Sequence, residues 1–165
     1  MKRKKSDLHR LIAELDSDLD LLENLKQKNE RAWQRVEQGS FEELDWAGLG
    51  YTIHNIYNLL ENYFLRISKF FENSLDPLSW NRDVIEHMRL DIDGVRPALL
   101  DRELAARIDE LRSFRHVFRN IYQAGLDPKR VELVQQRLDP SLAGFKRAHK
   151  EFLKKLKAIA SLVKD

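Results

Sequence analysis

Cysteine is absent from the 165 residues of this chain, which excludes disulfide bonds, thiolate metal sites and cysteine nucleophiles. The chain also lacks an apolar run approaching the roughly 18 residues that a membrane-spanning helix requires. Its basic start, MKRKK, is followed by the charged, amphipathic stretch SDLHRLIAELDSD, whereas a secretory signal would continue with an apolar segment. We therefore expect a cytoplasmic protein that does not enter a membrane.

Neither sign of charge dominates, because the formal net charge at pH 7 is only +2. The overall balance therefore does not indicate a nucleic-acid-binding protein. Positive charge is nevertheless concentrated in three stretches, at residues 2–5, 102–119 and 146–157. A lysine-rich helix face is usually solvated surface, and this is our interpretation of the last stretch.

Motifs for a metal or a nucleotide are missing as well. Asp16, Asp18 and Asp20 have the spacing that begins an EF-hand loop, but Leu21 and Gln27 stand where that loop needs glycine and glutamate. The stretch DIDG at 91–94 resembles the metal aspartates of nucleotidyltransferases, yet no suitably spaced Gly-Ser turn precedes it. A P-loop, a dinucleotide-binding glycine pattern and a nucleophile elbow are all absent. No two histidines have the four-residue spacing of a helical metal site: they are His9, His54, His87, His116 and His149. We expect no metal and no cofactor.

Helical periodicity is what the sequence has in abundance. Apolar residues recur at three- and four-residue steps from Leu8 onward, after Ser6 as the expected N-cap, and the pattern stops at Gly39. A second helix is expected from Phe41 or Leu44 to Glu72. Its apolar stripe consists of Ile53, Ile56, Tyr57, Leu60, Phe64, Ile67 and Phe71. The structural reason for Gly48 and Gly50 near its start would be close packing against a neighbouring helix.

Proline and glycine divide the rest of the chain. We expect a short helix over about 78–91, a long one over about 101–124, a short one near 128–138 and a last one over about 140–163. The residues that mark the breaks are Pro77, Gly94, Pro97, Gly125, Pro128 and Pro140. With no strand-like alternation and no internal repeat, the sequence predicts one all-α domain over 1–165. Its architecture would be an up-and-down antiparallel helical bundle.

The stretch RSFRHVFRNIY, residues 112–122, combines an apolar helix face with a basic one. On a helical wheel, Arg112, Arg115, Arg119 and Tyr122 form one stripe. Like charges at these spacings repel each other, so three stacked arginines need an anionic partner. Guanidinium groups bind phosphates bidentately and keep their charge. The stripe is therefore either a phosphate-binding site or part of a salt-bridge network with carboxylates from another helix.

This stretch resembles the motif of the HEPN superfamily, specifically that of the HepT-like ribonuclease toxins. The motif is Arg, a polar residue, three variable residues, His, one more residue and Tyr, and it falls on Arg115, His116, Asn120 and Tyr122. IHNIYNLLENYFLRISKFFE at 53–72 is similar to the second helix of that family. SWNRDVIEHM and VRPALLD resemble the segments that follow it. The similarity runs from about residue 48 to 127.

The resemblance implies a HEPN-type, nucleotidyltransferase substrate-binding-like helical bundle that forms a homodimer. Two copies of the motif helix would line one positively charged cleft that cleaves RNA without a metal. The implied partner is a minimal nucleotidyltransferase antitoxin, which in some systems transfers AMP to the motif tyrosine, here Tyr122. Arg115 would stabilise the charge at the phosphate, with Arg112 and Arg119 binding phosphate beside it.

Asn120 departs from the motif, because the family has its proton-carrying histidine at this position. An asparagine amide donates hydrogen bonds but does not exchange a proton usefully near pH 7. His116 could carry protons in its place, with Asn120 orienting the 2′-OH or a phosphate oxygen. Otherwise His116 is an exposed helix residue or the partner of a carboxylate. His54 and Glu61, two turns apart on the second helix, lie near the interhelical groove or serve as polar core residues. Two functions remain open: a ribonuclease toxin, or a non-catalytic helical partner of a nucleotidyltransferase.

Overall fold

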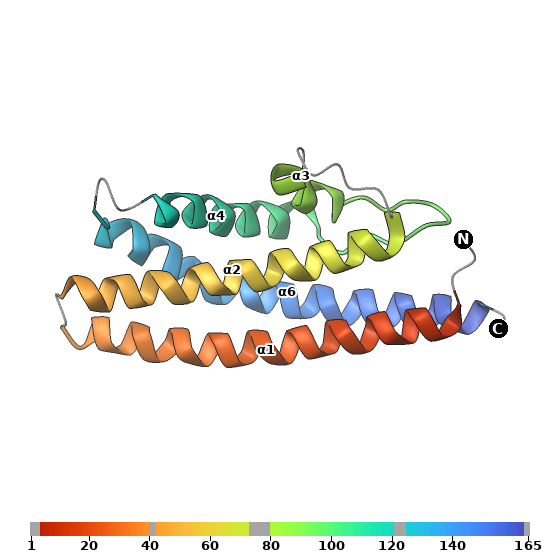
Figure 1. Cartoon of the computed structure of the whole chain (residues 1–165), viewed down its shortest axis with the longest axis horizontal. Coiled ribbons are helices and arrows are strands. Elements are labelled where there is room, and N and C mark those ends of the chain that lie inside the picture. The colour runs from red at the N-terminus through yellow and green to blue at the C-terminus, as the bar shows by residue number, and fades with distance from the viewer. Residues whose placement is uncertain (1–3, 40–41, 73–79, 121–124, 164–165) are drawn as a thin grey trace.

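Four long helices and one short one make up the described part of the chain (Figure 1). The computed structural model describes residues 4–39, 42–72, 80–120 and 125–163, with the backbone alone at 80–83. Its helices are α1 (Lys5–Glu37), α2 (Glu43–Glu72), α3 (Trp80–His87), α4 (Arg102–Arg119) and α6 (Pro128–Leu162). These ranges contain no strand, only an isolated bridge between Ile92 and Arg96, so the predicted all-α fold class is confirmed.

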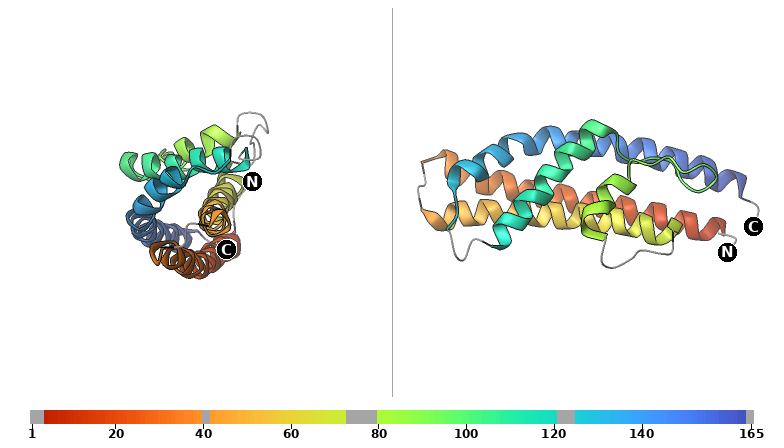
Figure 2. Two further views of the ribbon diagram at one scale, coloured as in Figure 1. Left: turned by 90° about the vertical axis from the view of Figure 1, so that its left-hand side faces the viewer. Right: turned by 90° about the horizontal axis from the view of Figure 1, so that it is seen from above.

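The long helices alternate in direction, as expected for an up-and-down bundle (Figure 1). α1 packs against α2 and α6, and α4 packs on α2 and α6 from the other side. Seen from above, α4 crosses these helices obliquely, with α3 next to it (Figure 2). The C-terminal half of α4 therefore lies over the N-terminal half of α2, and this crossing brings the residues of the motif stretch onto the second helix.

The apolar stripe predicted for the second helix is the centre of the core. All seven of its residues are buried: Ile53, Ile56, Tyr57, Leu60, Phe64, Ile67 and Phe71. Tyr63 and Phe64 make edge-to-face contacts with Phe145 of α6, at 5.0 and 6.1 Å between ring centres. The polar residues His54, Asn58 and Glu61 of α2 are only partly buried and lie outside this core stripe.

The first helix begins one residue before the predicted N-cap, so the assignment of Ser6 as N-cap is wrong. Lys4 takes that position, because its carbonyl accepts hydrogen bonds from Asp7 and Leu8, and the Asp7 carboxylate accepts from the Lys4 N–H at 3.3 Å. Gly39 ends the helix as expected, with a φ of 89° that favours glycine.

The predicted break at Pro140 is also wrong, because α6 continues through this residue. Proline removes one backbone hydrogen bond but does not end a helix whose two halves are both held by packing. Leu138, Ser141 and Leu142 are buried on either side of it, while Pro140 is exposed. The Ser141 hydroxyl donates to the Arg137 carbonyl at 2.7 Å, a bond that tends to bend helices. The path of α6 is curved (Figure 2).

A connection built around Arg96 sets the start of α4. The Arg96 side chain is fully buried and donates to Glu72 at 2.7 Å and to the carbonyls of His87 and Leu90. Asp101 then caps α4 by accepting from the Leu104 N–H at 2.7 Å. α3 ends at His87, before the predicted 91, and α4 ends at Arg119 with Asn120 as its C-cap. Residues 78–79 and 121–124 of the two predicted helices lie outside the described ranges. None of the described helices is long and apolar enough to span a bilayer.

Candidate functional site

Arg115 is the one arginine of the basic stripe that turns into the bundle, where only 8% of it is exposed. Its Nη1 and Nη2 donate to the two carboxylate oxygens of Glu61 on α2, the second at 3.0 Å. Nη1 also donates to Asn58 Oδ1 at 3.1 Å, and the guanidinium carbon lies 4.7 Å from the centre of the Tyr57 ring. The salt-bridge interpretation of the stripe therefore holds for Arg115.

Asn58 connects Arg115 to a histidine. Its Oδ1 accepts from Arg115, and its Nδ2 lies 2.9 Å from Nε2 of His54, one turn earlier on α2. We call the five residues joined in this way the Arg115 cluster: His54, Tyr57, Asn58, Glu61 and Arg115. Four of them stand on α2 at three- and four-residue steps, so one helix face presents them all to α4.

A close approach of α4 to α2 covers one side of the His54 ring. The Phe118 ring lies 5.7 Å from it and stacks in turn on Phe114 at 5.9 Å. Gly50 makes this approach possible, because a Cβ there would lie 2.7 Å from a Phe118 ring carbon. The close-packing reason expected for Gly50 is thus confirmed, whereas Gly48 is exposed and has nothing within 4 Å of such a Cβ.

The surroundings shift the acidity of two cluster members. Burial lowers the pKa of His54 below 6.5, and the charges of Arg119 and Arg115 lower it further, while Glu61 acts in the opposite direction. Burial, with Glu61 next in effect, raises the pKa of the Tyr57 phenol. The imidazole and the phenol are therefore both neutral near pH 7, and the charge of the cluster resides on Arg115 and Glu61.

The other two arginines of the stripe lie closer to solvent. Arg112 Nε donates to Asp109 of its own helix at 2.6 Å, a contact that neutralises part of its charge. Arg119 is exposed and forms no ion pair with any described residue. The structure thus separates the three arginines that the helical wheel placed on one stripe: one is buried, one is paired locally and one is available to an anion.

His116 and Asn120 lie on the solvent side of α4. His116 is exposed, and its side chain makes no hydrogen bond to a described residue. Asn120 is the C-cap of the helix: its backbone N–H donates to the Val117 carbonyl, and its amide Nδ2 donates to the His116 carbonyl at 2.9 Å. Tyr122, the expected AMP acceptor, lies outside the described residues.

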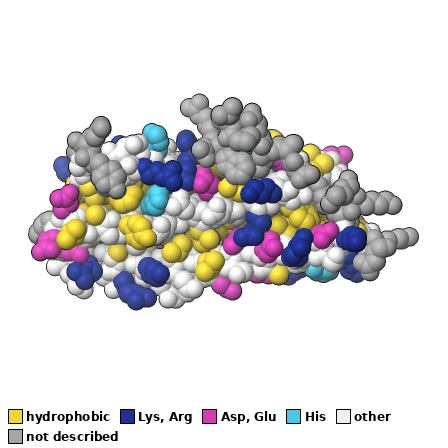
Figure 3. Space-filling model, viewed as in Figure 1, with side chains coloured by type: hydrophobic (Ala, Val, Ile, Leu, Met, Phe, Trp, Pro, Cys, Tyr) yellow, Lys and Arg dark blue, Asp and Glu magenta, His cyan; other side chains and the backbone are white. Residues whose placement is uncertain are grey.

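The cluster reaches the surface where α4 lies over α2. On the face shown in Figure 3, Lys and Arg side chains adjoin His side chains in this region. A row of apolar side chains follows α2 beside them. Basic and apolar side chains therefore adjoin each other on this face of the molecule.

Sequence reasoning singled out Arg115, His54 and Glu61 but missed Asn58 and Tyr57. The signal for Asn58 was its position, four residues after His54 and three before Glu61, which places all three on one helix face. Tyr57 was assigned to the core, and it is buried there, but its ring also supports the Arg115 guanidinium.

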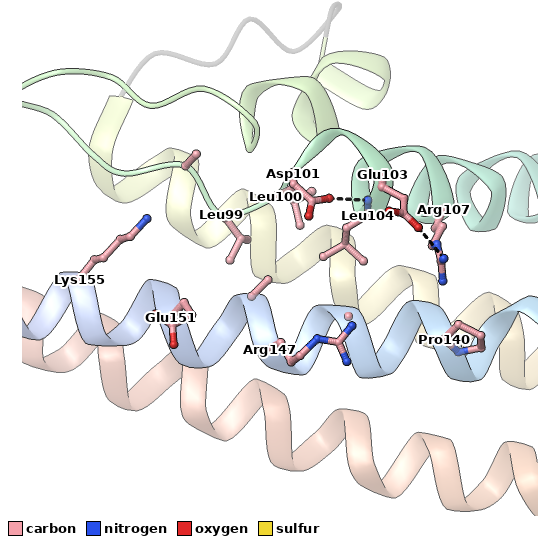
Figure 4. A pocket seen from close by; sticks show the side chains of 13 residues that line it. Leu99, Leu100, Asp101, Glu103, Leu104, Arg107, Pro140, Arg147, Glu151 and Lys155 are labelled. Carbon is pink, nitrogen blue, oxygen red and sulfur yellow. Dashed lines mark hydrogen bonds and ion pairs between the residues drawn. The ribbon is translucent and has the colours of Figure 1, made fainter.

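A separate hollow of about 500 Å³ lies between the start of α4 and the middle of α6 (Figure 4). Arg107, Arg147 and Lys155 line it, but so do Glu103 and Glu151, and Arg107 is already paired with Glu103 at 2.7 Å. With both signs of charge represented, its walls select neither anions nor cations. It shares no residue with the Arg115 cluster.

The cluster brings a guanidinium, an imidazole, an amide and a carboxylate within reach of one another. Such a set can bind a phosphate and transfer a proton. Across the described ranges, no three His, Asp or Glu side chains are grouped so that they could hold a metal ion.

One comparison with known proteins identifies a relationship. A family model described as HepT-like protein matches residues 48–156, about two thirds of the chain. The matched range includes every residue of the Arg115 cluster. No curated protein and no solved structure matches the chain.

Proposed function

We propose, because this chain belongs to the HepT-like family of the HEPN superfamily, that it is a metal-independent ribonuclease toxin of a toxin–antitoxin pair. The observation that carries the proposal is the placement of Arg115. The largely covered carboxylate of Glu61 orients its guanidinium at the junction of α2 and α4. Arg119, which forms no ion pair with a described residue, lies one turn further along the same helix. A site prepared for the negative charge of a phosphate has this form.

In the proposed reaction Arg115 and Arg119 bind and stabilise the scissile phosphate, and Arg112 extends the contact along the RNA backbone. Asn120 orients the 2′-OH or a phosphate oxygen. The 2′-OH is the nucleophile that RNA itself supplies, so the protein needs only a proton carrier and charge stabilisation. His116, from the motif, is one candidate for the proton carrier and His54 is another.

The proposal includes partners. Two copies of the chain would form a homodimer in the cytoplasm, with their α4 helices lining one cleft. A minimal nucleotidyltransferase would act as antitoxin by transferring AMP to Tyr122. Co-expression of the two proteins followed by mass spectrometry of the Tyr122 peptide tests this step, and an unmodified peptide would reduce the partnership to binding alone.

A second function is favoured by Asn120. The motif position for the proton carrier holds a side chain that cannot transfer protons near neutral pH, and its amide is bonded back to its own helix at 2.9 Å. On this alternative the chain is a non-catalytic helical partner that presents a substrate to a nucleotidyltransferase.

Incubation of the purified protein with RNA in EDTA separates the two functions. The ribonuclease proposal expects cleavage that is lost in Arg115→Ala and weakened in Arg119→Ala, an exposed position whose replacement does not threaten the fold. If the wild type does not cleave RNA and Asn120→His does, the binding function is established. If neither protein cuts, and RNA affinity lacks the steep salt dependence of phosphate contacts, the nucleic-acid function is wrong.

A further inference from the structure

The imidazole connected to Arg115 is not on the motif helix. His54 is joined to Arg115 through a single side chain, Asn58, with contacts of 2.9 and 3.1 Å. By contrast, the side chain at position 120 is bonded to its own helix, and His116 is exposed without a side-chain partner among the described residues. The structure therefore offers a histidine at the expected phosphate site, but from α2.

The hydrogen bonds fix which nitrogen of His54 carries the proton. Because Asn58 Oδ1 accepts from Arg115, its Nδ2 is the atom that faces His54, and this NH₂ group donates to Nε2. Neutral His54 then carries its proton on Nδ1, which is fully buried and has no hydrogen-bond partner among the described residues. The lone pair lies on Nε2, on the side of the ring that faces the Arg115 cluster.

We propose that His54 is the catalytic proton carrier of this site, in place of the histidine that the motif has at position 120; the assignment rests on the ribonuclease function proposed above. Nε2 exchanges the Asn58 amide for the 2′-OH and takes its proton. The 2′ oxygen forms a bond to phosphorus, and the bond from phosphorus to the 5′ oxygen breaks. The leaving oxygen takes a proton from water, and the imidazolium returns its proton to the hydroxide that remains. A 2′,3′-cyclic phosphate and a 5′-hydroxyl are the products.

The groups that face His54 favour its role as a base. Arg115 and Arg119 approach it from α4, and Glu61 and Asn58 from α2, while Phe118 covers one side of the ring. Burial and the two arginines keep the imidazole neutral near pH 7, so that its lone pair is available. Until the 2′-OH replaces it, the Asn58 amide holds Nε2 toward the Arg115 cluster, and Phe118 packs against the ring throughout.

The experiment compares four proteins on one fluorescently labelled oligoribonucleotide in EDTA. They are the wild type, His54→Gln, His116→Gln and the control His9→Gln, which changes an exposed histidine on α1. We expect His54→Gln to lower kcat by about 10²- to 10⁴-fold, the usual contribution of general acid–base catalysis, with little change in KM. His9→Gln should cleave at the wild-type rate, and circular dichroism should show that each variant is folded.

If His54 has only a structural role, adding a free base to a variant that lacks it will not restore RNA cleavage. His54→Ala removes the imidazole, and free imidazole in solution should restore part of the cleavage to this variant but not to Arg115→Ala. The acid limb of the pH–rate profile should lie below pH 6.5 in the wild type. In rescued His54→Ala it should move to the pKa of free imidazole, because the added base has replaced the side chain.

The outcomes separate the two proposals. If wild type cleaves and His54→Gln cleaves equally well, this assignment is wrong while the ribonuclease function stands, and loss in His116→Gln would then locate proton transfer on α4. If His54→Gln is folded and inactive but His54→Ala shows no rescue by imidazole, His54 is a positioning residue rather than the base. Wild type that leaves RNA intact overturns the ribonuclease function and this assignment together.

Discussion

Arg115 combines two roles that are usually in conflict. A buried guanidinium must be paired, since the loss of one partner leaves an uncompensated charge in a poorly solvated place. A phosphate-binding guanidinium must keep donors for its ligand. Here Glu61 and Asn58 occupy the two terminal nitrogens, and the Nε–H makes no hydrogen bond to a described residue. Pairing therefore fixes the orientation of the side chain and leaves two N–H groups, one on Nε and one on Nη2, as donors for an anion.

The first prediction concerns this pair. Glu61→Gln should lower the free energy of unfolding by about 3 kcal/mol, because the Arg115 side chain, only 10% exposed, loses its counter-charge. The matched control is Glu103→Gln. That glutamate is 77% exposed and pairs with Arg107 one turn along α4, so its replacement should cost less than about 0.5 kcal/mol. Urea unfolding measures both, and equal effects would show that the Arg115–Glu61 pair is effectively solvated.

The second prediction concerns pH and His54. Burial and the nearby arginines hold the pKa of this histidine in the folded protein below 6.5, so the unfolded chain binds the proton more readily. Its contribution to stability is therefore complete above pH 6.5 and is lost as the pH falls toward the folded-state pKa. Between about pH 7.5 and pH 5.5 the wild type should lose more stability than His54→Gln does. If the free energies of unfolding of the two proteins change in parallel across that range, the pKa of His54 is not lowered by folding, since the other histidines are common to both proteins.

At this scale the sequence predicted the types of residue better than their partners. The motif located Arg115, and the structure places His116 and Asn120 on the solvent side of the same helix. The wheel could not show that Arg115 pairs with Glu61, because their contact depends on the crossing of α4 over α2. Nor could the wheel show that Arg112 is paired locally while Arg119 is not paired with a described residue, because this difference depends on Asp109, the partner of Arg112.

Among the elements, α6 shows where sequence rules and packing compete. Pro140 predicted a break on local grounds, but the helix is continuous because buried side chains on both sides hold it in place. The stop at Gly39 was predictable because glycine and the end of the apolar period coincide there, and the end of α2 at Glu72 was predictable because its apolar stripe ends at Phe71. Where two local signals agreed, prediction succeeded; where one proline opposed a long apolar stripe, tertiary packing prevailed.

The third prediction concerns a polar connection between three helices. Asn29 of α1 exchanges two hydrogen bonds of 2.8 Å with Gln135 of α6 and donates to Thr52 of α2 at 2.9 Å. Asn29→Leu leaves the buried Gln135 amide without its partner and should cost about 1–3 kcal/mol. The double variant Asn29→Leu/Gln135→Met removes both polar groups and should recover much of that loss. Chemical denaturation of the single and double variants checks this, and a double variant as unstable as the sum of two singles would contradict it.

At the scale of the whole molecule, the site lies at the surface of a single chain rather than inside it. The Arg115 cluster opens where α4 crosses α2, on the same face as a row of apolar side chains along α2 (Figure 3). Tyr51 on this helix is 59% exposed and Leu44 is 80% exposed. A second copy that packed against this face would cover apolar surface and bring two arginine sites together, which is the arrangement that the proposed homodimer requires.

The last prediction tests that arrangement. Light scattering on the purified protein at micromolar concentration should give twice the 19.5 kDa of one chain. Tyr51→Asp should shift the mass toward one chain without unfolding it, because a charge on a covered apolar surface opposes association while an exposed side chain contributes little to the fold. Leu133→Asp, at a position on α6 that is 55% exposed, is the matched control and should leave the mass unchanged. If the dimer also forms the cleft, RNA cleavage per chain should fall in Tyr51→Asp but not in Leu133→Asp. A wild-type mass of one chain would remove the homodimer from the proposal, and a dimer that Tyr51→Asp leaves intact would move its interface away from this face.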